Sequence, residues 1–411
     1  MYLTGLVHRD RLFGLATRWF SDRVEGGDGR FLTEAFVYES LISSPTSQRF
    51  MVEILNRIYP GPLRLQRIYQ KDDLREAILT GCPEPTDRME SLFQEYLELP
   101  EEFFPRTPVD LVLGIDGEGL LRGAMRIKRV RRVAEKASRR VADRLAGAIN
   151  QQARGLAEAR ARAVGIPLHL LTTPPETMNE EFRTAERVVS RAFREQQIRF
   201  APEDLRVDDV IGLKFVGNPA ELGRIEQVIA EHPAATIAQR EEHHGDYNDI
   251  NLLVDLRVPP GPRLVRRMEG RDWSFVAGRG LDPDALTRGF GPYVETGDPT
   301  FRTEIILTTY EELAESEFGR SIHEKRILDQ RQSAPYRGRI AMNAACIIEY
   351  LLMLAISPTL EVRSLPVKMW GRYLPDTFSR AVWRLFGVEH GGVLSDPLVL
   401  EPTPILESEP V

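Results

Sequence analysis

Three short apolar runs constrain the fold of this 411-residue chain more than any other feature. They are residues 208–217, 248–258 and 303–308 (DDVIGLKFVG, NDINLLVDLRV and TEIILT). Each run has the length of a strand and is rich in aliphatic residues. The second run has aliphatics at nearly every position, which predicts a strand buried on both faces. Helix-forming segments follow the first run at 219–231 and the third run from Thr309, so the pattern predicts a mixed α/β domain.

Changes in composition divide the chain into four predicted parts. Residues 1–105 look helix-rich, because 45–59 and 86–104 carry apolar residues at three- and four-residue spacing. The run FFPRTP (103–108) marks a boundary, since two prolines cannot lie inside one continuing helix. The predicted parts are a helix-rich N-terminal domain over 1–105, an α/β domain with a mixed sheet over 106–330, a helical C-terminal extension over 331–390 and an acidic, proline-rich tail over 391–411.

The α/β domain is predicted to open with a β-hairpin over 109–127 and to continue into a long basic helix over 128–163. The stretch 122–144 holds ten basic and two acidic residues, for a local charge of +8. One interpretation is a solvated helix face or a dock for the acidic tail. The other is RNA or DNA backbone binding. The chain's net charge of −7 and the lack of interleaved aromatic residues argue against nucleic acid as the main partner.

Carboxylates border each of the three apolar runs. Asp209 opens the first run, Asp249 and Asp255 flank the second, and Glu304 opens the third. A buried strand tolerates a carboxylate only where something compensates its charge, and a divalent cation is the usual agent at phosphate-handling sites. The alternative is that these side chains cap strand ends and face water.

Two other segments are predicted to be surface loops. His243 and His244 lie between the predicted strands, where polar clusters are usually loops. The glycine-rich stretch 270–300, which contains Trp273 and Tyr293, is interpreted as a loop rather than a lid.

The apolar runs resemble, in order, motifs of the RelA/SpoT family of alarmone synthetases, which make (p)ppGpp. Asp209-Val-Ile-Gly-Leu-Lys-Phe-Val resembles the family strand D-L-I-G-I-R-V-I, and Tyr247-Asn-Asp-Ile-Asn-Leu-Leu-Val resembles Y-x-S-I-H-x-x-V. Glu304-Ile-Ile-Leu-Thr-Thr resembles E-I-Q-I-R-T followed by a helix. Upstream, residues 126–136 resemble the R-x-K-…-K segment that handles the ATP donor. The resemblance covers residues 120–325.

This resemblance implies a nucleotidyltransferase-like domain and an ATP-dependent pyrophosphokinase. Such an enzyme transfers pyrophosphate to the 3′-hydroxyl of a guanosine or adenosine nucleotide. The resemblance makes Asp209 and Glu304 the candidate catalytic residues and the ligands of Mg²⁺, with Glu304 acting as metal ligand or base. The acceptor nucleotide is expected to stack on Tyr247. The other candidate nucleotide-binding residues are Arg126, Lys128, Lys136, Lys214 and Asn251.

Three positions depart from the family pattern. Asn251 stands in place of a histidine, Ile306 in place of a glutamine, and Lys214 in place of an arginine whose bidentate fork lysine lacks. The broader nucleotidyltransferase motif D-I-D-L-L-V also resembles the run from Asp249, but Asn251 removes its second carboxylate. These departures keep a second class of function open: a catalytically degenerate relative that binds nucleotide or RNA as a sensor or interaction module.

We expect a soluble, cytoplasmic protein with no membrane partner. The N-terminal residues lack a basic stretch followed by a clean apolar run. The most apolar segment, 341–356, contains Asn343 and Glu349 and is shorter than the ~20 residues that a membrane span needs, so it predicts a core helix. Two cysteines exclude a disulfide scaffold. The sequence leaves the oligomeric state open, so an oligomer remains an alternative to a monomer.

Overall fold

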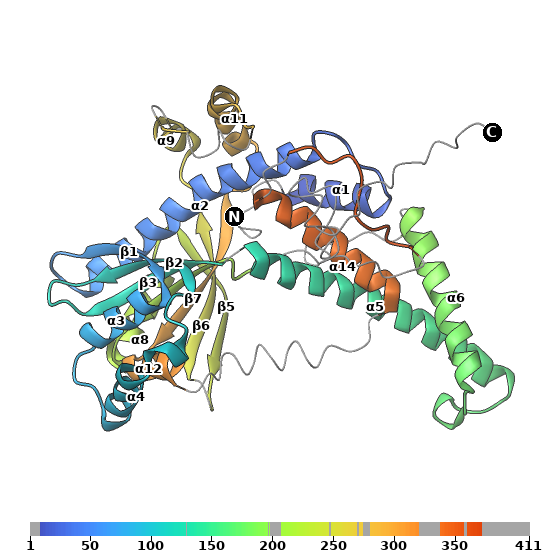
Figure 1. The fold of residues 1–411 in the computed structure, drawn as a ribbon, viewed down its shortest axis with the longest axis horizontal. Coiled ribbons are helices and arrows are strands. Elements are labelled where there is room, and N and C mark those ends of the chain that lie inside the picture. Colours follow the sequence, from blue (N-terminus) through green and yellow to red (C-terminus); the bar gives the residue numbers. More distant parts are fainter. Residues whose placement is uncertain are drawn as a thin grey trace, which may run out of the picture.

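The computed structural model describes residues 9–128, 130–195, 197, 207–245, 248–268, 271–273, 280–319, 338–356 and 360–371. These residues form a mixed α/β protein in which one mixed sheet of seven strands is flanked by helical regions (Figure 1). The predicted fold class is therefore confirmed. The predicted acidic tail, 391–411, lies outside the described residues.

The sheet has the strand order β1-β2-β3-β4-β7-β6-β5. Its strands are β1 (Arg64–Gln70), β2 (Pro108–Ile115), β3 (Leu121–Ile127), β4 (Ile211–Val216), β5 (Ala235–His243), β6 (Asp249–Arg257) and β7 (Thr300–Thr308). The central pair β4 and β7 is parallel, and every other neighbouring pair is antiparallel. The predicted hairpin is β2 and β3, and the three apolar runs are β4, β6 and β7.

The helices lie around this sheet and beside it. They are α1 (Arg9–Phe20), α2 (Asp28–Ile58), α3 (Lys71–Thr80), α4 (Asp87–Glu98), α5 (Val130–Ala163), α6 (Pro175–Arg194), α8 (Pro219–Ala230), α9 (Gly261–Arg266), α11 (Pro283–Glu295), α12 (Tyr310–Phe318) and α14 (Gly338–Met353). Three short 3₁₀ segments are η1 (Pro100–Phe103), η2 (Leu168–Leu170) and η3 (Leu354–Ile356).

One face of the sheet is covered by the main hydrophobic core. Met125, Leu213 and Ile305 lie at the same level of β3, β4 and β7, so their side chains point to one face. All three are buried in a core that includes residues of α2 such as Leu55. The long helix α2 therefore lies across this face.

The opposite face is covered only in part. At its β1–β3 end, α3, α4 and α12 pack a second core against the sheet. Along β6 the pattern alternates, with Leu252 and Val254 buried and Asn251 and Leu253 half-exposed. The prediction that this strand is buried on both faces is therefore wrong. This half-exposed face is where polar side chains of the central strands project.

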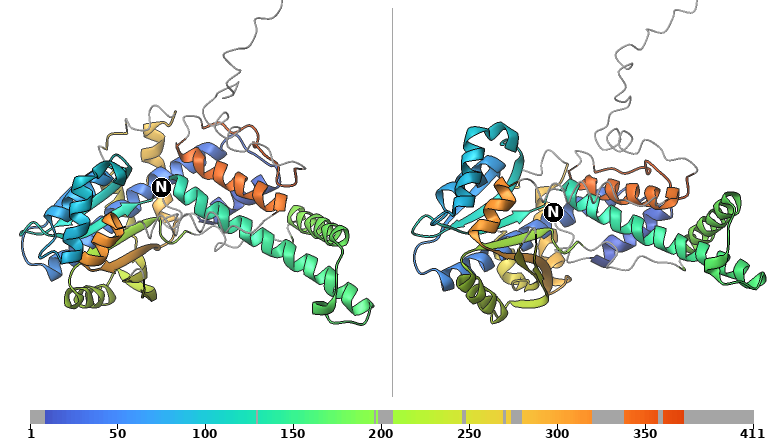
Figure 2. Two further views of the ribbon diagram at one scale, coloured as in Figure 1. Left: turned by 60° about the horizontal axis from the view of Figure 1, so that its bottom comes forward. Right: turned by 90° about the horizontal axis from the view of Figure 1, so that it is seen from below.

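Helices α5 and α14 form a second layer beside the sheet. The apolar segment around Ile347 and Leu351 lies in α14 and is buried against α5, which confirms the predicted core helix. Figure 2 shows α5 running away from the sheet, with α6 packed near its far end. Within the ranges that the structure describes, no helix combines the length and apolar character needed to cross a bilayer.

Two strands come from segments that the sequence does not mark as strands. β1 arises within the region 1–105 and pairs with β2. Any domain boundary at residue 105 therefore falls between two hydrogen-bonded strands, and the division of the chain stays a prediction. β5 contains His243, whose Nδ1 lies 2.6 Å from Oδ1 of Asp249, so the loop interpretation of His243 is wrong.

The interpretation of 270–300 as a surface loop is also wrong where the structure describes it. Most of its second half is α11, and the hydroxyl of the buried Tyr293 donates to Oε1 of Glu39 at 2.8 Å. Trp273 is buried as well.

Candidate functional site

The half-exposed face brings together side chains from three neighbouring strands. Arg126 of β3, Gly212 of β4 and Glu304 of β7 lie at one level, so Arg126 and Glu304 project side by side across a residue without a side chain. The Nη2 atom of Arg126 lies 3.6 Å from Oε2 of Glu304. A Cβ atom on Gly212 would lie 3.3 Å from Nε of Arg126 and 3.8 Å from Oε2 of Glu304. Gly212 therefore leaves the space in which this ion pair forms.

Asp209 accepts from two lysines that arrive from different elements. The backbone N–H of Lys128 donates to the carbonyl of Val210 at 2.9 Å, which extends the β3–β4 pairing and sets Lys128 beside Asp209. Lys136 comes from the second turn of α5. The Nζ atoms of Lys128 and Lys136 both bond Oδ2 of Asp209. The side chains of Lys128 and Asp209 are only 11% and 18% exposed, and that of Lys136 is 32% exposed.

For both Lys128 and Asp209, burial and the ion pairs shift the pKa in opposite directions. Burial, reinforced by the charge of Arg126, lowers the pKa of Lys128 to about 8, although Glu304 and Asp209 oppose this shift. Burial alone would raise the pKa of Asp209, but Lys128 and Lys136 hold that pKa well below its usual range. Asp209 is therefore ionised at any ordinary pH, while Lys128 titrates close to neutrality.

Glu304 is held at one oxygen. Its Oε1 accepts from Nδ2 of Asn251 at 3.0 Å. Its Oε2 is buried and, among the described residues, has no hydrogen-bond partner, while Nη2 of Arg126 forms an ion pair with it at 3.6 Å. A buried acceptor that lacks a hydrogen-bond donor is a place where a further cation or a proton donor would be stabilised.

The two carboxylates meet the modest requirement that Mg²⁺ places on a protein. Mg²⁺ usually takes one or two protein carboxylates and completes its shell with waters and substrate phosphates. Asp209 and Glu304 are carboxylates of that kind, with Arg126 lying 3.6 Å from Oε2 of Glu304, and both carboxylates act on the charge of Lys128. Within the described part of the chain, no three His, Cys, Asp or Glu side chains form a ready metal site. Mg²⁺ binding through these two residues stays a prediction.

Lys214 lies one level further along β4, opposite Ile306 of β7, which in turn lies opposite Asn251 of β6. Burial lowers the pKa of Lys214, and the carboxylate of Glu317 on α12 opposes that shift. Burial would raise the pKa of Glu317, but Lys71 and Lys214 together lower it, and Nζ of Lys71 bonds Oε2 of Glu317. The sequence gives no sign of Lys71 or Glu317, since no motif joins two residues so far apart.

The structure thus brings six of the candidate residues onto one face: Arg126, Lys128, Lys136, Asp209, Lys214 and Glu304. Asn251 joins them through its bond to Glu304. Tyr247, the predicted stacking residue, lies outside the described residues. Its neighbour Asn248 donates from Nδ2 to Oε1 of Glu312 at 2.7 Å.

Much of the basic stretch 122–144 is engaged inside the molecule. Arg122 is buried, with its Nε 2.7 Å from Oδ2 of Asp116. Arg132 and Arg139 both pair with Glu135, at 2.9 Å and 3.3 Å. Lys128 and Lys136 are held by Asp209, so the stretch does not present a continuous row of unpaired cations. This arrangement does not favour the interpretation that it binds RNA.

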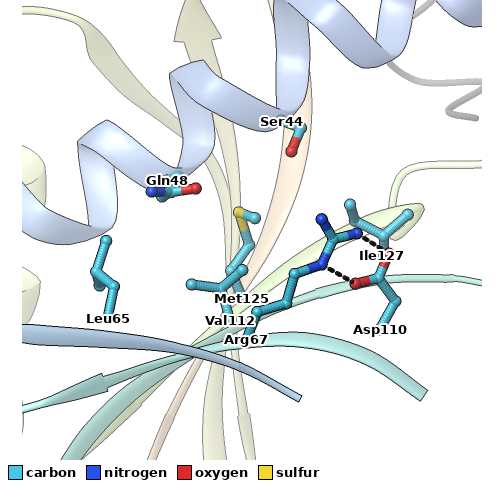
Figure 3. Close-up of a pocket in the computed structure, with 8 residues that line it drawn as sticks. All are labelled: Ser44, Gln48, Leu65, Arg67, Asp110, Val112, Met125 and Ile127. Carbon is cyan, nitrogen blue, oxygen red and sulfur yellow. Dashed lines mark hydrogen bonds and ion pairs between the residues drawn. The ribbon is translucent and has the colours of Figure 1, made fainter. Parts of the chain in front are cut away.

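A cavity of ≈220 Å³ lies on the other face of the sheet, below α2 (Figure 3). Ser44 and Gln48 of α2 face the bidentate pair of Arg67 and Asp110, whose two bonds are each 3.0 Å long. The cavity includes Met125, whose side chain points away from Arg126. It is therefore separate from the half-exposed face that carries Arg126, Asp209 and Glu304, which we call the charged face.

Comparison with known proteins gives distant likenesses only. No family model matches the chain, and no curated protein sequence matches it. Small alarmone synthetase 1 from Bacillus subtilis is similar over 57% of this chain and 74% of its own, at 12% identity and a TM-score of 0.22. A GTP pyrophosphokinase family protein from Streptococcus pneumoniae is similar over 52% of this chain and 87% of its own, at 12% identity and a TM-score of 0.19.

Proposed function

We propose that the chain is a pyrophosphokinase-like transferase that moves a pyrophosphoryl group from ATP to the 3′-hydroxyl of a guanosine or adenosine nucleotide. The observation that carries the proposal is the convergence of cations with two carboxylates on one half-exposed face. The cations are Arg126, Lys128, Lys136 and Lys214, and the carboxylates are Asp209 and Glu304. An excess of cations over carboxylates suits a polyphosphate, whose charge must be neutralised for it to react.

In the proposed reaction, the 3′-oxygen of the acceptor forms a bond to the β-phosphorus of ATP. The bond between that phosphorus and the oxygen bridging to the α-phosphate breaks, and AMP leaves. The hydroxyl proton passes to Glu304, whose second oxygen is oriented by Asn251. Lys128 and Lys136 hold the phosphate oxygens as charge shifts to the leaving group. With Glu304 acting as the base, Mg²⁺ held by Asp209 would add charge neutralisation.

The test is a transfer assay on the purified chain. ATP labelled at the β-phosphate is incubated with Mg²⁺ and, in turn, GDP, GTP and ADP, and the products are separated by anion exchange. We expect a labelled 3′-pyrophosphorylated product and an equal amount of AMP. Lys128→Met should lower the rate at least ~10²-fold, because charge placed on a transition state supplies several kcal/mol. Arg132→Gln removes a cation that pairs with Glu135 rather than with Asp209, and it should leave the rate within about threefold of wild type.

A different outcome would point to the second class of function. If the wild-type chain binds one of these nucleotides but transfers no label at saturating Mg²⁺, the protein is a nucleotide-binding module rather than an enzyme. If it binds none of them, the proposed use of the charged face is wrong.

A further inference from the structure

A second pocket lies between α2 and the segment that contains α9, away from the charged face. Its volume is ≈430 Å³, which is within the ~300–1,000 Å³ range of small-molecule sites. Its apolar lining residues include Leu41, Pro45, Leu264 and Met268. Figure 1 shows α9 beside the middle of α2, on the far side of that helix from β1. This pocket is distinct from the cavity of Figure 3, although Gln48 borders both.

Arginines supply the polar side of this α2–α9 pocket. Arg49 comes from α2, and Arg267 and Arg271 come from the residues that follow α9. No carboxylate in the described ranges forms an ion pair with Arg49 or Arg267. Arg49 and Arg267 therefore bring positive charge to the pocket that no carboxylate in the described ranges pairs with, and such charge favours an anionic ligand.

Pro45 lies inside α2 and has no N–H to donate to the carbonyl of Leu41. Leu41 and Pro45 both line the pocket. A ligand that combines an apolar body with an anionic group therefore matches the mixed lining of this pocket.

We propose that the α2–α9 pocket binds an organic phosphate with a flat, largely apolar body, such as a nucleoside phosphate. Guanidinium groups bind phosphate oxygens in a bidentate manner, which makes arginine the residue suited to this role. The sulfur of Met268 and the ring of Pro45 are suited to the face of an aromatic base. The inference is independent of the transferase reaction, since the pocket shares no residue with the charged face.

The test is calorimetric titration of the full chain with GDP, ADP, inorganic pyrophosphate and glucose 6-phosphate. The titrations use Lys128→Met/Lys136→Met as the background, so that the charged face contributes little. In that background, we expect GDP or ADP to bind more tightly than pyrophosphate and glucose 6-phosphate, which lack an apolar body. Adding Arg49→Gln and Arg267→Gln should weaken the nucleotide at least ~10-fold, because two charge-assisted contacts are lost.

The matched control adds Arg263→Gln and Arg266→Gln instead. These changes also remove two positive charges, but at positions of α9 that do not line the pocket. The affinity for GDP or ADP should therefore stay within about threefold of that of the background variant. Urea unfolding of each variant checks that the fold is kept, and Arg267→Gln alone provides a milder change. The proposal is overturned if no nucleoside phosphate binds, or if both pairs of substitutions weaken binding equally. It is also overturned if a short RNA binds with the same dependence on Arg49 and Arg267 while GDP and ADP do not.

Discussion

The pair of lysines on Asp209 makes Asp209→Asn the most informative single change. Asparagine keeps the shape of the side chain but leaves Lys128 and Lys136 without a counter-charge. Breaking a fully buried ion pair by removing one partner lowers stability by about 3–5 kcal/mol. Here the Lys136 side chain is 32% exposed, so water screens part of its interaction. We therefore expect the free energy of unfolding to fall by about 2–3 kcal/mol at pH 7.

The effect should depend on pH in a defined direction. The lowered pKa of Asp209 means that its contribution is present above its unfolded pKa of 3.8 and is lost as the pH falls through the folded value. Lys128 has a pKa of about 8, so its charge disappears as the pH rises above that value. The stability difference between wild type and variant should therefore narrow between pH 7 and pH 9.5.

Urea unfolding followed by circular dichroism measures these free energies. The matched control is Asp110→Asn, which breaks an exposed bidentate pair with Arg67 and should cost less than about 1 kcal/mol. If both variants lose the same stability, or if the Asp209→Asn difference is equal at pH 7 and pH 9.5, the two lysines do not hold Asp209 as described.

Three further predictions concern single residues. Tripolyphosphate should bind less tightly as the pH rises from 7 to 9, because Lys128 loses its charge near pH 8. In titration calorimetry, Lys128→Arg should remove most of this decrease in affinity, since arginine keeps its charge over that range. Gly212→Ala should weaken ATP binding about 3- to 10-fold, because the added Cβ would lie 3.3 Å from Nε of Arg126 and displace that side chain. The free energy of unfolding should stay within about 1 kcal/mol of wild type. Equal ATP affinities of wild type and variant would show that Arg126 does not contact the nucleotide. Asp28→Ala should lower the free energy of unfolding, measured in urea, by about 3 kcal/mol. The reason is that this buried carboxylate accepts hydrogen bonds from Nε1 of Trp19 at 2.8 Å and from Arg18. A loss below ~1 kcal/mol would show that these hydrogen bonds do not stabilise the fold as described.

The strands that the sequence predicts are those with a buried face. β4, β6 and β7 each pack aliphatic side chains into the core, and this burial favours the aliphatic residues from which the strands are predicted. β1 and β5 are the two edge strands, and most of their side chains face water, so backbone hydrogen bonds rather than apolar burial hold them. Neither strand shows the alternation by which a strand is recognised.

The candidate site divides in the same way. Asp209 and Lys128 can be placed together from the sequence, because both border strands that resemble the motifs of one family. Lys71 and Glu317 are 246 positions apart and belong to no motif, so only the packing of α3 and α12 brings them together. Gly212 appears in the family-like strand, but its use as an empty space between two side chains becomes evident only from the sheet register.

Because β4 pairs with β7, which comes much later in the chain, the charged face can be completed only late in protein synthesis. Residues 217–299 separate the two strands, and they include the β5–β6 hairpin, whose strand β6 pairs with β7 on the side away from β4. Closing a long loop carries an entropic penalty that nearby contacts must already offset. A growing chain therefore has Asp209 and its lysines well before it has Glu304. Until β7 has left the ribosome, the nascent protein has the four cations of its site but only one of the two carboxylates.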